Sequence, residues 1–208
     1  MQEIELYHIH KKTYMNAKWI EKGFINIDDK FNSIMNQRQQ NFSQTLQIEN
    51  QQYNYDIYLF QYLEDIKNLK IVKKDDLEEL KELLRVGLNM SYQANFFKRE
   101  AALEDCRKEH YSELPSRLHC IYLCDYDGLE YWNNIISNSG KEEVEIFRVL
   151  SQGKIFKTNE QLLPLETETY GGTYNAAFKY WNPKFKNVPN HANEYLTQGK
   201  IKILSKVK

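Results

Sequence analysis

Two histidines near the start of the chain have a type and spacing that could support chemistry. His8 and His10 are two residues apart in an alternating segment, so their side chains share one face of a strand. Imidazole pairs of this kind occur in zinc sites, but a competent site needs three or four ligands. The other His and Cys residues show no recognisable ligand spacing. We therefore expect no metal, and we expect His10 to be a half-buried, hydrogen-bonded ring.

A second set of chemically capable side chains lies in P-S-R-L-H-C-I-Y-L-C-D-Y-D-G-L-E-Y-W, which is residues 115–132. Residues 118–124 are almost all apolar or aromatic, which predicts a strand covered on both sides. Asp125 and Asp127 are suited to cap a following helix that carries Trp132. A strand, a polar cap and an aromatic-bearing helix form a frame for a ligand site. The predicted faces are Leu118, Cys120, Tyr122 and Cys124 on one side, and Ile121 and Leu123 on the other.

Composition and length favour one folded domain covering residues 1–208. Hydrophobic residues make up 41% of the chain, and 15 Tyr and 10 Phe argue against global disorder. The net charge of -1 provides no overall attraction to nucleic acid or membrane. Three cysteines and an acidic N-terminus without an apolar leader predict free thiols in the cytoplasm. The sequence has no apolar stretch long enough to predict a membrane span.

The elements that would position these side chains can be predicted from periodicity. Residues 4–10 alternate and predict the first strand. Residues 36–54 are rich in Gln and Asn, which predicts a surface loop, and residues 55–62 fit either a strand or a helix. Two amphipathic helices, 75–88 and 91–110, are expected to form a helical insertion at about 75–111.

The C-terminal third predicts further strands and one short helix. Residues 144–150 and 153–156 are typical of two strands joined through S-Q-G. Residues 169–173 contain Gly171-Gly172 and predict a flexible loop, followed by a helix at 175–181. The alternation of residues 194–207 predicts a last strand or hairpin.

Three short strings, in their chain order, resemble the His-Tyr-Glu triad of the ADP-ribosyltransferase superfamily. They are L-Y-H in the opening strand, C-I-Y-L in the middle strand and N-E-Y-L at the last strand. The longer stretch A-A-L-E-D-C-R-K-E-H-Y-S-E-L-P-S-R-L-H-C-I-Y-L-C, with G-K-I-F and A-F-K-Y-W, is similar to an uncharacterised bacterial family over residues 94–208. The superfamily resemblance implies an α+β fold, with an ADP-ribosyltransferase-like split antiparallel β-sheet, flanking helices and a helical insertion.

The same resemblance implies a reaction in which NAD is the substrate. His8 would bind a ribose hydroxyl, Tyr122 would stack on the nicotinamide, and Glu194 would stabilise the cationic ribose as the glycosidic bond breaks. Trp132 would supply a second aromatic, and Arg117 would meet the pyrophosphate. The pentosyl group would pass to an unknown acceptor, which is a protein, a nucleic acid or a small molecule, or to water, and relatives of this kind include toxins.

Several departures and alternatives stay open on the sequence alone. Ile9 stands where many relatives have a small residue whose backbone binds the nicotinamide amide. Glu166 and Glu168 rival Glu194 as the carboxylate. Tyr122 is also interpretable as a core aromatic, Glu194 as a solvated strand-end charge and Arg117 as a buried ion pair. The competing function is an inactive nucleotide-binding or protein-interaction module on the same fold.

Overall fold

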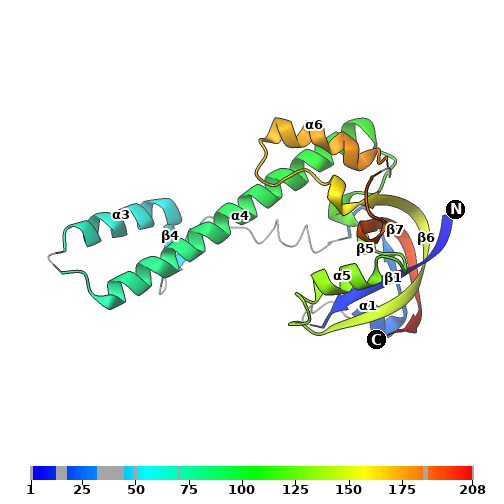
Figure 1. The fold of residues 1–208 in the computed structure, drawn as a ribbon, viewed down its shortest axis with the longest axis horizontal. Helices are drawn as coiled ribbons and strands as arrows, with labels where there is room; N and C mark the ends of the chain where they lie inside the picture. The colour runs from blue at the N-terminus through cyan, green and yellow to red at the C-terminus, as the bar shows by residue number, and fades with distance from the viewer. Residues whose placement is uncertain are drawn as a thin grey trace. The chain divides into compact units, whose positions relative to one another are not determined.

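The computed structural model describes residues 2–12, 18–31, 45–48, 51–69, 71–184 and 187–207. The fold is α+β, and the chain divides into two compact units. Unit 1 contains residues 1–37 and 99–208, and unit 2 contains residues 38–98. Figure 1 shows the five-stranded sheet of unit 1 and the paired helices of unit 2. The expected α+β class is therefore confirmed.

An antiparallel sheet forms the centre of unit 1. Its strands are β1 (Gln2–Lys11), β6 (Val144–Asn159), β7 (Asn193–Lys206), β2 (Phe24–Ile27) and β5 (Ile121–Leu123). The order is β1-β6-β7-β2, and β5 also pairs with β7. β5 takes the edge of β7 at Tyr195–Thr197, whereas β2 takes residues 199–202. Two short strands therefore share one edge of β7, and the sheet divides between them.

Paired glycines allow β6 and β7 to continue through this division. Gly153 and Gly199 lie opposite each other and have φ values of 144° and 129°. A Cβ on Gly153 would lie 2.3 Å from the backbone oxygen of Gln198, so only glycine fits this approach. The predicted pair of strands at 144–150 and 153–156 is consequently one strand, β6. The predicted final element is also one strand, β7.

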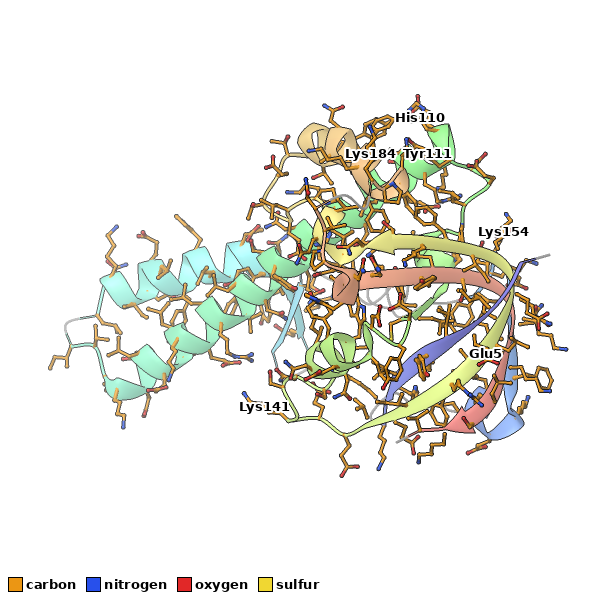
Figure 2. All side chains as sticks on the ribbon, turned by 45° about the vertical axis from the view of Figure 1, so that its right-hand side comes forward. Glu5, His110, Tyr111, Lys141, Lys154 and Lys184 are labelled. Atoms are coloured by element: carbon orange, nitrogen blue, oxygen red, sulfur yellow. The ribbon has the colours of Figure 1, made fainter. Side chains whose placement is uncertain are left out.

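Helices cover the sheet of unit 1 and create separate apolar clusters. The end of α4 (Lys74–His110) and α6 (Tyr170–Trp181) lie side by side (Figure 1) and enclose a cluster that includes Leu103, Cys120 and Trp181. At the end of α4, His110 lies beside α6 (Figure 2), with Nε2 3.0 Å from the hydroxyl of Tyr174. The helix α5 (Leu129–Ile136) packs on Ile9 in another cluster. The short α1 (Lys18–Lys22) adds Trp19 and Ile20 to a third, centred on the sheet.

The predicted central strand is shorter than expected. Residues Arg117–His119 form a 3₁₀ turn, η1, so only Ile121–Leu123 remain as β5. The turn forms because the Ser116 hydroxyl oxygen accepts a hydrogen bond from the Leu118 amide. The predicted faces are kept within β5, since Ile121 and Leu123 join one cluster and Tyr122 packs against another.

The caps and loops predicted around this strand also need correction. The N-cap of α5 is Gly128, and Asp125 contributes by accepting a hydrogen bond from the Gly128 amide. The predicted Gly171-Gly172 loop is the first turn of α6, which Thr169 caps by accepting from the Gly172 amide. The predicted helices 75–88 and 91–110 are the single helix α4.

Unit 2 is a small assembly around the first part of α4. It also contains β3 (Thr45–Ile48), β4 (Gln51–Asn54) and α3 (Tyr55–Lys67). The Gln/Asn-rich segment predicted as a loop at 36–54 therefore holds an antiparallel pair, and its residues 36–44 and 49–50 lie outside the described residues. The Tyr55 hydroxyl donates to the Leu83 carbonyl at 2.6 Å, which joins α3 to α4.

Within the parts of the chain described above, no helix has both the length and the apolar character needed to cross a membrane.

Candidate functional site

A row of alternating charges runs through unit 1 and ends on Glu194. Arg99 Nη1 lies 2.9 Å from Glu166, and Arg99 Nη2 lies 3.2 Å from Glu100. Arg117 Nε donates to Glu100 at 2.8 Å, and Arg117 Nη1 donates to Glu194 Oε1 at 3.3 Å. Glu166, one rival for the catalytic carboxylate, is thus the outer end of a row whose inner end is Glu194.

Three chain segments bring this row together. Glu100 comes from a buried face of α4, between Phe96 and Leu103 in the helical repeat. Arg117 begins η1, and Glu194 is the second residue of β7. The side chains are almost inaccessible, with exposed fractions of 2% for Glu100, 3% for Arg117 and 5% for Glu194. Buried charges are tolerated when they are paired and hydrogen-bonded, as they are here.

Two tyrosines complete the surroundings of Arg117 and Glu194. The Tyr180 hydroxyl donates to Glu194 Oε1 at 2.8 Å and is also contacted by Arg117 Nη1. The Arg117 guanidinium carbon lies 4.9 Å from the Tyr180 ring centroid and 5.3 Å from that of Tyr122. The Tyr122 hydroxyl donates to the Arg117 carbonyl at 3.0 Å. Guanidinium–aromatic contacts of this kind are attractive, so both rings help to fix Arg117.

The electrostatics of Glu194 result from opposing influences. Burial raises the pKa of Glu194, and the nearby carboxylates Glu100 and Glu160 raise it further. The charge of Arg117 and the hydrogen bond from Tyr180 lower this pKa. The net shift of the Glu194 pKa is upward. Burial would lower the pKa of Arg117, but Glu100 and the other neighbours raise it well above its usual value. Arg117 therefore remains protonated, and Glu194 is a carboxyl group with an elevated pKa beside a permanent cation.

A more accessible group of side chains lies close to Glu194 in space. Tyr131 of α5 donates to Glu160 Oε2 at 2.8 Å, and its ring centroid is 4.9 Å from that of His191. Burial raises the pKa of Tyr131 to about 12, with Glu160 and Glu194 contributing. Trp132 Nε1 donates to the Asn193 carbonyl at 2.7 Å, which ties α5 to the residue preceding Glu194. We call Tyr131, Trp132, Glu160 and His191 the rim.

The structure brings together some of the residues predicted from the sequence and separates others. Arg117, Tyr122 and Glu194 meet in the buried row, and Trp132 reaches it through the Asn193 carbonyl. Ile9 packs beneath α5 in the cluster that Trp132 also contacts. The His8 imidazole is hydrogen-bonded to the backbone of Tyr122, but its side chain lies on the other face from the Tyr122 ring, which differs from the predicted roles of both side chains in binding one NAD.

Strand register explains why the side chains of His8 and Tyr122 separate. Tyr7 and Cys124 form an antiparallel bridge, with Tyr7 N donating to Cys124 O at 2.8 Å. Side chains alternate along each strand from this bridge, so Tyr122 lies on the face of Tyr7 and Cys124 while His8 lies on the opposite face. The His8 ring instead contacts Trp19, with centroids 5.2 Å apart.

His8 is nevertheless an unusual residue. Burial, helped by His10, lowers the pKa of His8 to about 4, so its imidazole is neutral at pH 7. Its Nδ1 is buried and has no hydrogen-bond partner among the residues that the structure describes. Within the same residues, no cluster of three or more His, Cys, Asp or Glu side chains suited to a metal occurs.

Sequence reasoning missed Glu100, Tyr180, Glu160 and Tyr131. A signal for Glu100 existed, because an acidic residue lies among buried apolar residues of an amphipathic helix. Tyr180 and Glu160 carry no comparable signal, since their contacts with the site depend on tertiary structure. The remaining rival, Glu168, is exposed at the start of α6, near Gly172.

Comparison with family models matches residues 6–208 to the model described as "Protein of unknown function (DUF2441)". The chain belongs to the DUF2441 family. The matched range of this DUF2441 chain includes residues of both units. It agrees with the similarity to an uncharacterised family expected from the sequence, and it extends that similarity to the N-terminal half. A search of curated proteins gives no match.

Proposed function

We propose that this protein is an NAD-consuming ADP-ribosyltransferase or NAD glycohydrolase in which Glu194 is the catalytic carboxylate. The observation that carries the proposal is the placement of Glu194, held by Arg117 and Tyr180 at the start of β7 and beside the rim. The resemblance of the L-Y-H, C-I-Y-L and N-E-Y-L strings supports the choice of NAD.

The chemistry requires a fixed negative charge. When the bond between ribose C1′ and nicotinamide breaks, its electron pair leaves with nicotinamide and the ribose becomes oxocarbenium-like. A carboxylate held in a low-dielectric site stabilises that cation without reorganising. The acceptor, or water, then adds to C1′ and loses a proton. Glu194 would supply the charge, and Arg117 would favour the ionised form of Glu194 by opposing the effect of burial.

The contacts also change the roles of two residues within the proposal. The Arg117 guanidinium is already bound to Glu100 and Glu194, so we assign Arg117 to the positioning of Glu194 rather than to the pyrophosphate. Tyr122 lies against Arg117, so it supports the guanidinium. Tyr131 of the rim is the aromatic that we expect to meet the nicotinamide. The proposal does not depend on His8.

One observation favours the alternative function of a binding module without turnover. Arg117 and Glu194 are 3% and 5% exposed and are bound to each other, which is also the arrangement of a purely structural ion pair. In that case the rim would bind a nucleotide, and Glu194 would only stabilise the fold.

Incubation of the purified full chain with NAD distinguishes these functions. The proposal predicts release of nicotinamide, measured by chromatography, and incorporation of label from adenine-labelled NAD if an acceptor is present. Binding of NAD, measured by calorimetry, without nicotinamide release would support the alternative. Absence of both binding and release would contradict both functions.

A further inference from the structure

We propose that unit 2 joins two copies of this chain through an antiparallel pairing of their α4 helices. The contact surface is the α4 stripe, which we define as Leu77, Leu84, Leu88 and Tyr92. This inference concerns residues of unit 2 alone and is independent of the NAD reaction.

The α4 stripe is an apolar surface on one face of a helix. Its exposed fractions are 54% for Leu77, 48% for Leu84, 73% for Leu88 and 54% for Tyr92. The successive spacings of seven, four and four residues place all four side chains along one side of α4. With a rise of 1.5 Å per residue, the α4 stripe is about 22 Å long.

The face of α4 that meets α3 is a different one. The Tyr55 hydroxyl donates to the Leu83 carbonyl, and the Tyr62 hydroxyl donates to the Asp76 carbonyl at 3.0 Å. Gly87 lies so close to the Tyr55 ring that an added Cβ would be 2.1 Å from the hydroxyl. The side of α4 that carries Asp76, Leu83 and Gly87 therefore faces α3, and the exposed α4 stripe lies on another side of the helix.

Unit 2 has little core of its own. Among its described residues, the buried hydrophobic side chains are Tyr55, Leu83 and Phe96. Ten other large hydrophobic residues of this unit are exposed. Helices depend on the packing of an apolar face, and small units rarely bury enough surface without a partner. Covering the α4 stripe would supply that missing burial.

The charges beside the α4 stripe identify a second copy as the partner. Glu78 and Arg85 flank the α4 stripe on one side of the helix. An antiparallel alignment that places Glu78 opposite Arg85 of the second copy is repeated by the twofold axis, which gives two oppositely charged pairs across the contact. In the same alignment Leu77 lies between Leu84 and Leu88 of the second copy, so the leucines interdigitate. A twofold interface requires this kind of self-complementarity.

In the single chain, Glu78 and Arg85 form ion pairs with neighbouring side chains of α4. Lys81 lies 3.1 Å from Glu78 and Arg85 lies 2.5 Å from Glu82, and all four side chains are well exposed. Such surface ion pairs contribute little to the free energy of unfolding, and their side chains can exchange partners readily. The charges are therefore available for pairing across the interface, where they select the antiparallel register.

Sedimentation equilibrium of the full chain tests the pairing. We expect a concentration-dependent dimer, and Leu84→Gln should weaken it by about tenfold or more in Kd, because a leucine at the centre is lost. Leu165→Gln is the matched control, since Leu165 is an exposed leucine of unit 1, 67% exposed. A monomer at all accessible concentrations, or a dimer insensitive to Leu84→Gln, would overturn the proposal.

A charge exchange tests the register. Arg85→Glu alone places two glutamate side chains opposite each other across the interface and should weaken the dimer. The double change Glu78→Arg with Arg85→Glu reverses both members of the pair and should restore it. A heterologous or parallel contact would not be restored by this exchange. Failure of the double variant to recover the parent Kd, with circular dichroism showing unchanged helix content, would therefore contradict the antiparallel pairing.

Discussion

Unit 1 and unit 2 differ in which side chains they shield from water. Unit 1 buries Glu100, Arg117 and Glu194 almost completely, whereas unit 2 leaves Leu84 and Leu88 about half exposed or more. Both arrangements have an energetic disadvantage, since buried charges lose hydration and exposed leucines do not gain from burial. In each unit this energetic cost indicates that the side chains concerned serve a function other than stabilising the fold. We assign a reaction centre to the buried charges and a self-association surface to the exposed leucines.

The first prediction concerns the ion pairs of the two units. Arg117→Met should lower the free energy of unfolding by about 3 to 5 kcal/mol, because it leaves Glu194 buried without its cation and leaves Glu100 paired with Arg99 alone. Arg85→Met is the matched change in unit 2, where the partner Glu82 is solvated, and it should have a much smaller effect. Denaturant titration of both variants measures the contrast. Equal losses for the two variants would remove the distinction between the units.

The charge row also shows where sequence reasoning reaches its limit. The positions of β1 and β7 follow from alternation, although each is buried on both faces over part of its length, at Leu6 and Ile9 in β1 and at residues 193–198 in β7. The burial of Arg117 does not follow from alternation, because its partners Glu100 and Glu194 are 17 and 77 residues away in sequence. The sequence leaves a buried ion pair open as an alternative, but it contains no means of choosing the partners.

Element boundaries differ from the sequence predictions for local physical reasons. The sequence predicts a break in β6 near Gly153, yet Gly199 opposite it lets the two backbones approach and the ladder continue. The Gly171-Gly172 pair predicts a loop, but the Thr169 side chain starts a helix there. Two helices are predicted in place of α4, although residues 89–90 contain neither proline nor glycine to end the first. Helix caps and cross-strand partners thus determine where these elements begin and end more strongly than the local amino-acid composition does.

The second prediction is that unit 1 makes the protein sensitive to acid. The folded-state pKa of His8 is lowered to about 4 from 6.5, so its neutral form contributes stability above pH 6.5 that is lost as the pH falls through 4. The loss from this group should be about 3 kcal/mol. His8→Phe should make the free energy of unfolding less pH-dependent over this range, measured by denaturant titration at several pH values.

Glu194 acts in the opposite direction and must be considered in that experiment. Its folded-state pKa is raised, so its contribution is fully present below the unfolded pKa and is lost as the pH rises through the folded value. Comparison of the combined His8→Phe and Glu194→Gln variant with the single His8→Phe variant separates the contributions of the two groups to the pH dependence of the free energy of unfolding. An unchanged pH dependence in His8→Phe would show that this ring is not the buried neutral group.

The third prediction concerns the leucines, and the smallest of all the expected effects is that of Leu84→Ala. Leu103 of unit 1 is fully buried, so Leu103→Ala should reduce the free energy of unfolding by about 2 to 5 kcal/mol. Leu84→Ala should change it by no more than about 0.5 kcal/mol at protein concentrations where the chain is monomeric. A large loss for Leu84→Ala under monomeric conditions would mean that the α4 stripe serves the fold of unit 2 rather than a second copy.

The most direct test of the central claim is the rate of nicotinamide release by Glu194→Gln compared with Glu104→Gln. Both are buried carboxylates, but Glu104 accepts hydrogen bonds from Arg107 and Ser116, outside the row that ends on Glu194. We expect Glu194→Gln to lower kcat about 100- to 1000-fold while NAD binding persists, because the lost charge acts on the ribose cation. We expect folded Glu104→Gln to turn over NAD at nearly the parent rate. Turnover by Glu194→Gln at the parent rate would contradict the assignment of Glu194 as the catalytic carboxylate.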